Sequence, residues 1–131
     1  MEKKGRTEQD DQKMLQLAHA SRYHWGLVGT PRNKAVGDWQ ISRVYAALKQ
    51  PHLSLLFAEA SLEICTRQNL PEILATAYEG VARAYAVAED YAIARRYLKL
   101  ARDQLNTLDL GAEDRKAYLG QMDETEKLTT R

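Results

Sequence analysis

The sequence predicts an all-α protein of about six helices arranged as consecutive antiparallel hairpins. Apolar residues recur at steps of three and four along the chain, and no segment alternates apolar with polar residues, which favours helices over strands. Each of the three prolines stands where such a pattern begins, a position at which the missing proline N–H costs nothing. The segments between the patterns are short, and short connections force neighbouring helices to run antiparallel.

A charged tail, residues 1–10, is expected to precede a first helix that ends near Val28. The inner face of that helix is predicted to carry Met14, Leu17, Ala18, Ser21, Trp25 and Val28. Thr30 is a suitable N-cap for a second helix, which is expected over residues 31–49. Gly37 within this helix costs about 1 kcal/mol relative to alanine, which indicates that another helix passes close to it.

The remaining four helices differ in the width of their apolar faces. The third, after Pro51, is apolar on a wide arc and is therefore expected to lie centrally. The fourth, after Pro71, and the fifth, from Tyr91, each carry one unbroken stripe that faces a core. The last, over residues 112–128, has a weaker pattern. Residues 11–128 are thus predicted to form a single helical domain, long enough to bury a core without metals or disulfides.

The composition limits the classes of function and compartment. The formal net charge is +1, whereas a protein whose main role is to bind nucleic acid or an anionic membrane needs a basic excess. The single cysteine, Cys65, can form no internal disulfide, and no apolar run approaches the roughly 18 residues of a membrane span. The charged N-terminus lacks the apolar segment of a secretory signal. We therefore predict a cytoplasmic protein that binds neither nucleic acid nor membrane.

The sequence contains no recognisable catalytic or metal-binding pattern. An activated nucleophile needs a base that is itself held in place, and no acid completes such a relay near the serines. Cys65 lies on an apolar stripe and is predicted to be an inert core thiol. His19 and His24 are five residues apart, so they do not share a helix face as a metal-binding pair at i and i+4 does. The sequence therefore predicts a protein that is not an enzyme and that uses neither a metal nor a cofactor.

The chain repeats weakly with an offset of 40 residues. Arg43 aligns with Arg83, and aromatic residues align with aromatic ones, as Phe57 does with Tyr97. Three serines align with alanines: Ser42, Ser54 and Ser61 with Ala82, Ala94 and Ala101. Because small residues match small residues and aromatic residues match aromatic ones, the sequence indicates two related helix pairs.

The second copy, residues 77–101, resembles a tetratricopeptide repeat. The residues that match the motif are Tyr78, Val81, Ala82 and Tyr85 in the first helix and Tyr91, Ala94, Leu98 and Ala101 in the second. The first copy departs from the motif, because serines hold the small positions, Pro51 replaces the usual turn, and the period is 40 rather than about 34. The resemblance implies a short right-handed α-solenoid whose usual role is to bind a protein or peptide.

The resemblance also implies a concave face formed by the first helix of each pair. The residues expected there are Val36, Trp39, Arg43 and Ala46 from one helix and Thr76, Glu79, Arg83 and Ala86 from the next. Of these, Trp39, Arg43, Glu79 and Arg83 are the predicted partner-binding residues. The two arginines suit a carboxylate or phosphate of the partner, and Trp39 offers a flat apolar anchor. Alternatively, Glu79 already pairs with one of the arginines and the face is only solvated.

The stretch HASRYHW, residues 19–25, supports a second hypothesis. His24 and Arg22 are expected at the two edges of the inner face that carries Trp25, while His19 points largely away. This arrangement predicts either a hydrogen-bonded seam between the first two helices or the mouth of a small-molecule pocket, which could be enzymatic. The pocket would be lined by Arg22, His24, Trp25, Trp39 and Arg43.

A short array of helix pairs leaves its terminal faces uncovered. The weak last helix, or the apolar side of the first helix, is therefore expected to be covered by a second subunit. We predict a homo-oligomer in the form of a two-fold dimer, because closed symmetric dimers are the commonest assemblies.

Overall fold

The structure is a computed structural model, and it describes residues 7–129 apart from the side chains of residues 25, 26 and 28. In this range the chain forms six helices: α1 (Glu8–Val28), α2 (Pro31–Ala47), α3 (Pro51–Gln68), α4 (Pro71–Val87), α5 (Tyr91–Asn106) and α6 (Ala112–Lys127). The predicted all-α class is therefore confirmed. No helix in the described part of the chain is both long and apolar enough to cross a membrane.

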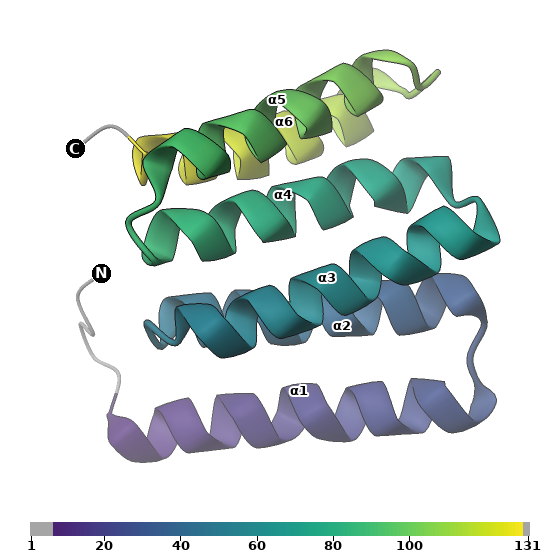
Figure 1. The fold of residues 1–131 in the computed structure, drawn as a ribbon. Helices are drawn as coiled ribbons and strands as arrows, with labels where there is room; N and C mark the ends of the chain where they lie inside the picture. Colours follow the sequence, from purple (N-terminus) through teal and green to yellow (C-terminus); the bar gives the residue numbers. More distant parts are fainter. Residues whose placement is uncertain (1–6, 130–131) are drawn as a thin grey trace.

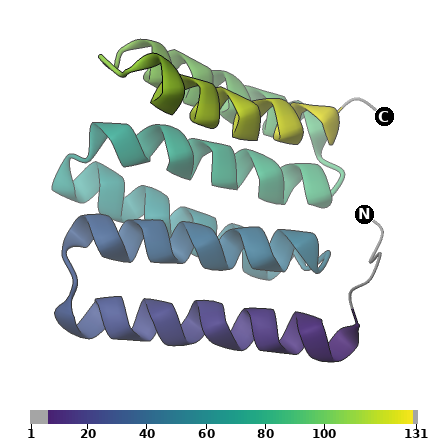
Figure 2. The ribbon, with the colours of Figure 1, turned by 180° about the vertical axis from the view of Figure 1, so that it is seen from behind.

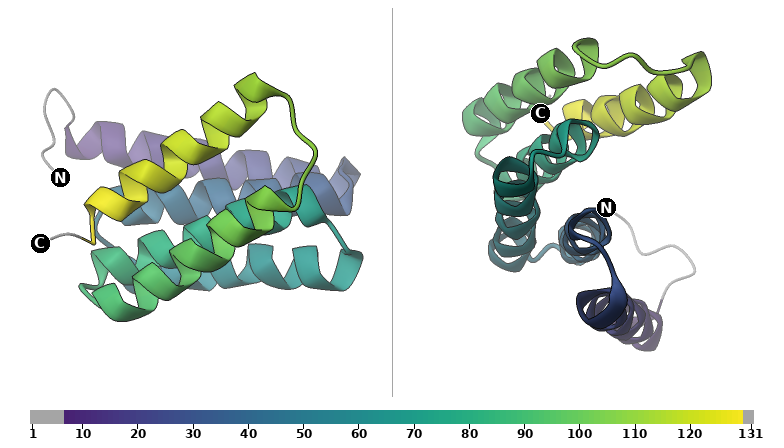
Figure 3. Two further views of the ribbon diagram at one scale, coloured as in Figure 1. Left: turned by 90° about the horizontal axis from the view of Figure 1, so that it is seen from above. Right: turned by 90° about the vertical axis from the view of Figure 1, so that its right-hand side faces the viewer.

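The helices form two layers (Figures 1 and 2). α2, α4 and α6 form one layer, α3 and α5 form the other, and α1 packs on α2 at one end of the stack. Consecutive helices run antiparallel, as the short connections predicted. The end view in Figure 3 (right) shows that α1 and α6 project from the same side of the molecule, with α2 and α4 between them. This side is concave.

The 40-residue repeat is visible in the packing of aromatic rings. Tyr45 of α2 stacks on Phe57 of α3, with ring centroids 5.7 Å apart and planes at 19°. The equivalent pair, Tyr85 of α4 and Tyr97 of α5, stacks at 5.9 Å and 12°. The turns after α2 and α4 also match, since each contains one non-glycine residue with a left-handed φ, Lys49 in the first turn and Glu89 in the second. The two helix pairs therefore share one packing geometry.

The serines of the first pair occupy buried positions at which the second pair has alanine. Ser42 Oγ donates to the Ser54 carbonyl at 2.7 Å, and Ser54 Oγ donates to the Ser42 carbonyl at 2.9 Å. Ser61 Oγ donates to the Ala35 carbonyl at 2.8 Å. Because every one of these hydroxyls is hydrogen-bonded, the small residue at each position can be polar without leaving an unsatisfied group.

The start of α1 differs from the expected boundary, because the helix begins within the segment assigned to the charged tail. Thr7 and Asp10 cap it reciprocally: the Asp10 amide donates to Thr7 Oγ1 at 3.1 Å, and the Thr7 amide donates to Asp10 Oδ2 at 3.0 Å. This is the geometry of a capping box, which satisfies two amides at a helix N-terminus. The helix therefore begins at Glu8.

The face with which α1 packs also differs from the prediction. The residues expected inside but found exposed are Leu17 and Ser21. His19, expected to point away, is half-buried, with its Nε2 3.1 Å from the Tyr45 hydroxyl. Arg22 Nε donates to Asp38 Oδ1 of α2 at 2.7 Å. The apolar residues of α1 do not gather on one face, so polar contacts to α2 decide how the helix is turned.

Gly37 confirms the expected close approach of a second helix. A Cβ atom at this position would lie 2.9 Å from Cδ and 3.7 Å from Cα of Arg22 on α1. Glycine therefore lets α1 and α2 pack closely beside the Arg22–Asp38 ion pair.

Thr30 caps α2 as predicted, because its Oγ1 accepts a hydrogen bond from the Asn33 amide at 3.2 Å. Replacing Thr30 by alanine is expected to lower the free energy of unfolding by about 1 kcal/mol, since the Asn33 N–H loses its acceptor. Urea denaturation measures the change. Thr66→Ala is the control: this exposed hydroxyl only bonds the Leu62 carbonyl of its own helix, an interaction that does not stabilise a helix. Equal losses in the two variants would contradict the capping role.

Candidate functional site

A groove of about 690 Å³ opens on the concave side. Its apolar lining includes Met14, Val44, Ala46, Ala47, Ala86, Val87, Tyr91 and Leu128. Its charged lining consists of Arg43, Lys49, Arg83, Glu89 and Glu124. A groove of this size, with apolar walls and a few charged groups, can accept a small ligand or several side chains of a peptide.

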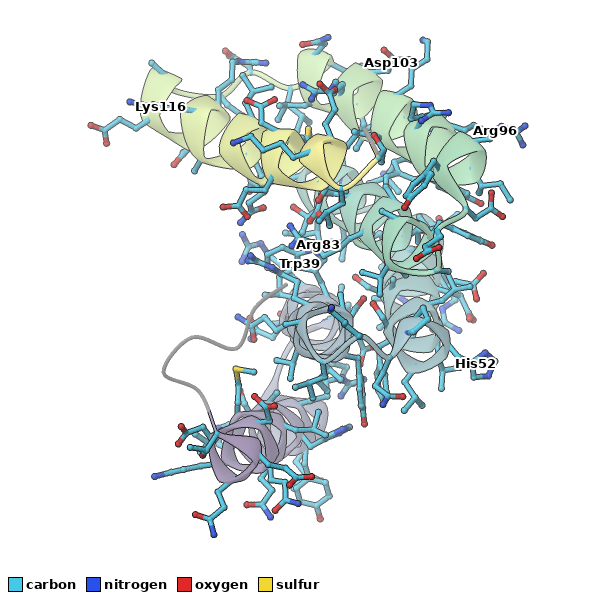
Figure 4. All side chains as sticks on the ribbon, turned by 90° about the vertical axis from the view of Figure 1, so that its left-hand side faces the viewer. Trp39, His52, Arg83, Arg96, Asp103 and Lys116 are labelled. Atoms are coloured by element: carbon cyan, nitrogen blue, oxygen red, sulfur yellow. The ribbon has the colours of Figure 1, made fainter. Side chains whose placement is uncertain are left out.

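The structure places half of the predicted concave-face residues in this groove, namely Arg43, Ala46, Arg83 and Ala86. Trp39 and Glu79 are buried beside them, with exposed fractions of 8% and 1%. Figure 4 shows Trp39 and Arg83 close together between α1 and α6, whereas His52 and Arg96 point outward from the opposite side. The four predicted partner-binding residues are therefore adjacent, but only the two arginines reach the groove.

Glu79 accepts hydrogen bonds from three helices. Trp39 Nε1 of α2 donates to Oε1 at 3.1 Å, and Arg83 Nε of α4 donates to Oε2 at 2.9 Å. Thr125 Oγ1 of α6 donates to the same Oε2 at 2.6 Å. We call Trp39, Glu79, Arg83 and Thr125 the Glu79 cluster. It joins α2, α4 and α6, the three helices of one layer, and it holds Arg83 in a fixed position.

The predicted pairing of Glu79 with an arginine is present, and so is a groove beside it. Trp39 does not offer the flat apolar anchor that was expected. Its N–H is bonded to Glu79, and the Arg43 guanidinium lies 5.0 Å from the ring centroid, in cation–π contact. The side chain of Trp39 thus supports Arg43 rather than facing a partner.

Arg83 has one nitrogen that its neighbours do not satisfy. Its Nη2 is buried and forms no hydrogen bond with any residue that the structure describes. It forms a long ion pair with the exposed Glu124 of α6, whose Oε2 lies 3.9 Å away. Buried donors in proteins are nearly always hydrogen-bonded, so a nitrogen without a hydrogen bond in a groove-lining side chain favours the binding of an acceptor.

The second predicted site is not assembled among the described side chains. Arg22 pairs with Asp38 at the contact of α1 with α2, whereas Trp39 and Arg43 belong to the groove side of α2. His24 is exposed, and the side chain of Trp25 lies outside the described residues. The hydrogen-bonded seam that was the alternative at this place is formed by Arg22 and His19.

Two groups at the helix contacts were not singled out as site residues by the sequence. Burial raises the pKa of Asp38 above its usual range, while the hydrogen bond and charge of Arg22 act in the opposite direction. Thr125 donates to Glu79 from α6, a helix whose apolar pattern is weak. No local feature of the sequence therefore identified Thr125 as a site residue. Cys65 was predicted to be an inert core thiol; it is 1% exposed, and burial raises its pKa to about 11.

Comparison of the chain with protein-family models, curated proteins and solved structures gives no match. The tetratricopeptide resemblance therefore stays a prediction. Among the described residues, no group of three or more His, Cys, Asp or Glu side chains could hold a metal ion. The groove and its two arginines, Arg43 and Arg83, are thus the candidate binding site.

Proposed function

We propose that this protein is a non-enzymatic module that binds a peptide segment of another protein in the groove between α1 and α6. An acidic group of that segment binds Arg43 and Arg83. The buried Nη2 of Arg83, which lacks a hydrogen-bond acceptor among the described residues, carries the proposal. A carboxylate supplies that acceptor, and hydrogen bonds between charged groups are about twice as strong as neutral ones.

Both arginines are held in place before any ligand arrives. Glu79 binds Nε of Arg83 and holds the guanidinium in a side chain that lines the groove. The Trp39 ring supports the Arg43 guanidinium. Side chains that are already ordered lose little conformational entropy on binding, so the pair is suited to recognition. The apolar walls of the groove would hold the side chains that flank the acidic group.

The tetratricopeptide resemblance supports the same role, because the concave face of such arrays is where partner segments bind. The cytoplasm is the compartment that we propose for this function. A single cysteine kept as a buried thiol is compatible with a reducing environment.

The probe for this function is a random dodecapeptide library displayed on phage and selected on the immobilised protein. We expect the selected peptides to share an Asp or Glu flanked by apolar residues. Arg43→Ala is then expected to weaken binding of a selected peptide about tenfold, because a charge-assisted hydrogen bond contributes roughly 1.5 kcal/mol or more. Fluorescence anisotropy with the labelled peptide measures the dissociation constant.

Arg96→Ala is the matched control, since Arg96 is an exposed arginine on the opposite side of the molecule. Its affinity for the peptide is expected to equal that of the unchanged protein. Arg83→Ala is less informative, because it also removes a partner of the buried Glu79 carboxylate. Selected peptides without an acidic residue, or equal affinities for Arg43→Ala and the unchanged protein, would refute the proposed role of the arginines.

A further inference from the structure

α1 exposes a row of large apolar side chains. Leu17, Tyr23 and Leu27 are 62%, 70% and 69% exposed. Among the described residues, α3 and α5 each expose a single large apolar side chain, and the remaining one, Leu128, follows the end of α6. α1 packs mainly on α2 and also touches α3, since the His19 ring centroid lies 5.5 Å from that of Phe57. Its outer side is therefore uncovered.

At the opposite end of the stack, the exposed face of α6 has a different composition. The exposed residues of α6 are small or polar: Ala112, Glu113, Asp114, Lys116, Ala117, Gly120, Asp123, Glu124, Glu126 and Lys127. A polar outer face is what closes the end of a stack of helices in water. α6 thus has the surface of a terminal helix, whereas the exposed surface of α1 combines polar residues with three large apolar side chains.

The exposed residues of α1 are arranged symmetrically about Ala20, so the same surface is presented when the helix direction is reversed. At 100° per residue, Leu17 and Tyr23 lie about 60° to either side of Ala20, and Lys13 and Leu27 lie about 20° to either side. All five residues are exposed, as are Gln16 and His24, which lie about 40° to either side of Ala20. Ala20 is therefore the centre of the row both along the helix and around it, and its small side chain permits a second helix to approach closely.

We infer that α1 is the interface of a two-fold dimer, in which the α1 helices of two copies pack antiparallel about Ala20. This arrangement brings Leu17 level with Tyr23 of the partner subunit. It also brings Leu27 level with Lys13 of the partner subunit, whose aliphatic stem covers apolar surface. A contact in which the same patch meets itself is the usual form of a two-fold interface. The inference does not depend on the groove.

Arg22, which pairs with Asp38 of α2, lies about 160° from Ala20 around the helix, so the proposed contact leaves the packing of α1 on α2 in place. The contact is confined to one helix of 21 residues from each subunit, so its area is at the small end of stable interfaces. The dimer should therefore dissociate on dilution.

Sedimentation velocity over a dilution series of the full chain tests the inference. We expect a mass of twice the 14.9 kDa of the chain at high concentration and the chain mass at low concentration. Leu17→Glu is expected to shift the high-concentration sample to the chain mass. Leu56→Glu on α3 is the matched control, because Leu56 is 56% exposed, and it should keep the dimer. Circular dichroism verifies that both variants are folded.

A second experiment tests the position of the two-fold axis. Two Cα atoms that face each other at the axis of packed helices lie about 5 Å apart, which is within the range of a disulfide. Ala20→Cys is therefore expected to form a disulfide-linked dimer in oxidised glutathione, whereas Ala117→Cys on the exposed face of α6 is not. Cys65 does not interfere, because its thiol is 1% exposed.

Three results would overturn the inference. The first is the chain mass at every concentration. The second is a mass that rises beyond two chains, which would indicate open, head-to-tail association. The third is a disulfide that forms as readily at position 117 as at position 20.

Discussion

Replacing Glu79 by alanine is expected to lower the free energy of unfolding by about 3 to 5 kcal/mol, the cost of removing one partner from a buried ion pair. Glu79 is 1% exposed and accepts hydrogen bonds from Trp39, Arg83 and Thr125. Its loss leaves an indole N–H, a guanidinium and a hydroxyl without their acceptor in a site from which water is excluded. Urea denaturation followed by circular dichroism measures the change.

Glu63→Ala is the matched control for this prediction. Glu63 pairs with Arg67 at the same i, i+4 spacing and 3.5 Å, but their side chains are 71% and 64% exposed. The loss of such a pair changes stability by no more than about 0.5 kcal/mol. Glu79→Gln separates charge from shape, because its amide oxygen can still accept a hydrogen bond, and we expect an intermediate loss. Equal stabilities of Glu79→Ala and Glu63→Ala would refute the importance of the Glu79 cluster.

Gly80→Ala is expected to destabilise the protein by up to about 2 kcal/mol. The added Cβ would lie 2.9 Å from Trp39 Cδ1 and 3.5 Å from the Ala58 Cβ. Trp39 cannot easily move aside, because it is 8% exposed and its N–H is bonded to Glu79. Overpacking of this kind costs about 1 to 3 kcal/mol, and it outweighs the gain of about 1 kcal/mol from the higher helix propensity of alanine.

Gly120→Ala is expected to have the opposite sign. Gly120 also lies inside a helix, α6, but an added Cβ would meet no atom within 4 Å. Only the propensity gain remains there, so the variant should be more stable by about 0.5 to 1 kcal/mol. Thermal denaturation of the two variants under one condition compares them directly. If Gly80→Ala also raised the melting temperature, the contact with Trp39 would not be the reason for glycine at position 80.

The helix boundaries could be predicted because their signals are local. Pro31, Pro51 and Pro71 each begin a helix in the structure, as their position in the sequence indicated. The start of α1 was missed although its signal was also local, since Thr7 and Asp10 have the spacing of a capping box. A charged composition alone had assigned these residues to the tail.

The orientation of α1 and the composition of the Glu79 cluster depend on tertiary packing. The single apolar stripe of α5 identified its inner face, but α1 has no such stripe and is turned by polar contacts of His19 and Arg22. The bond from Thr125 to Glu79 depends on how α6 crosses α4, which no spacing in the sequence encodes. The reasoning that singled out Gly37 would have applied equally to Gly80, because both glycines stand inside predicted helices.

The order of packing along the chain has a consequence for folding kinetics. Within the described residues, each helix packs only on helices one or two places away in the chain. Contacts between residues close in sequence require small loops to close, and proteins dominated by such contacts fold in about microseconds to milliseconds. The helix pairs α2–α3 and α4–α5 can each serve as a nucleus from which the stack grows in either direction. The ends of the chain need not find each other before the core begins to form.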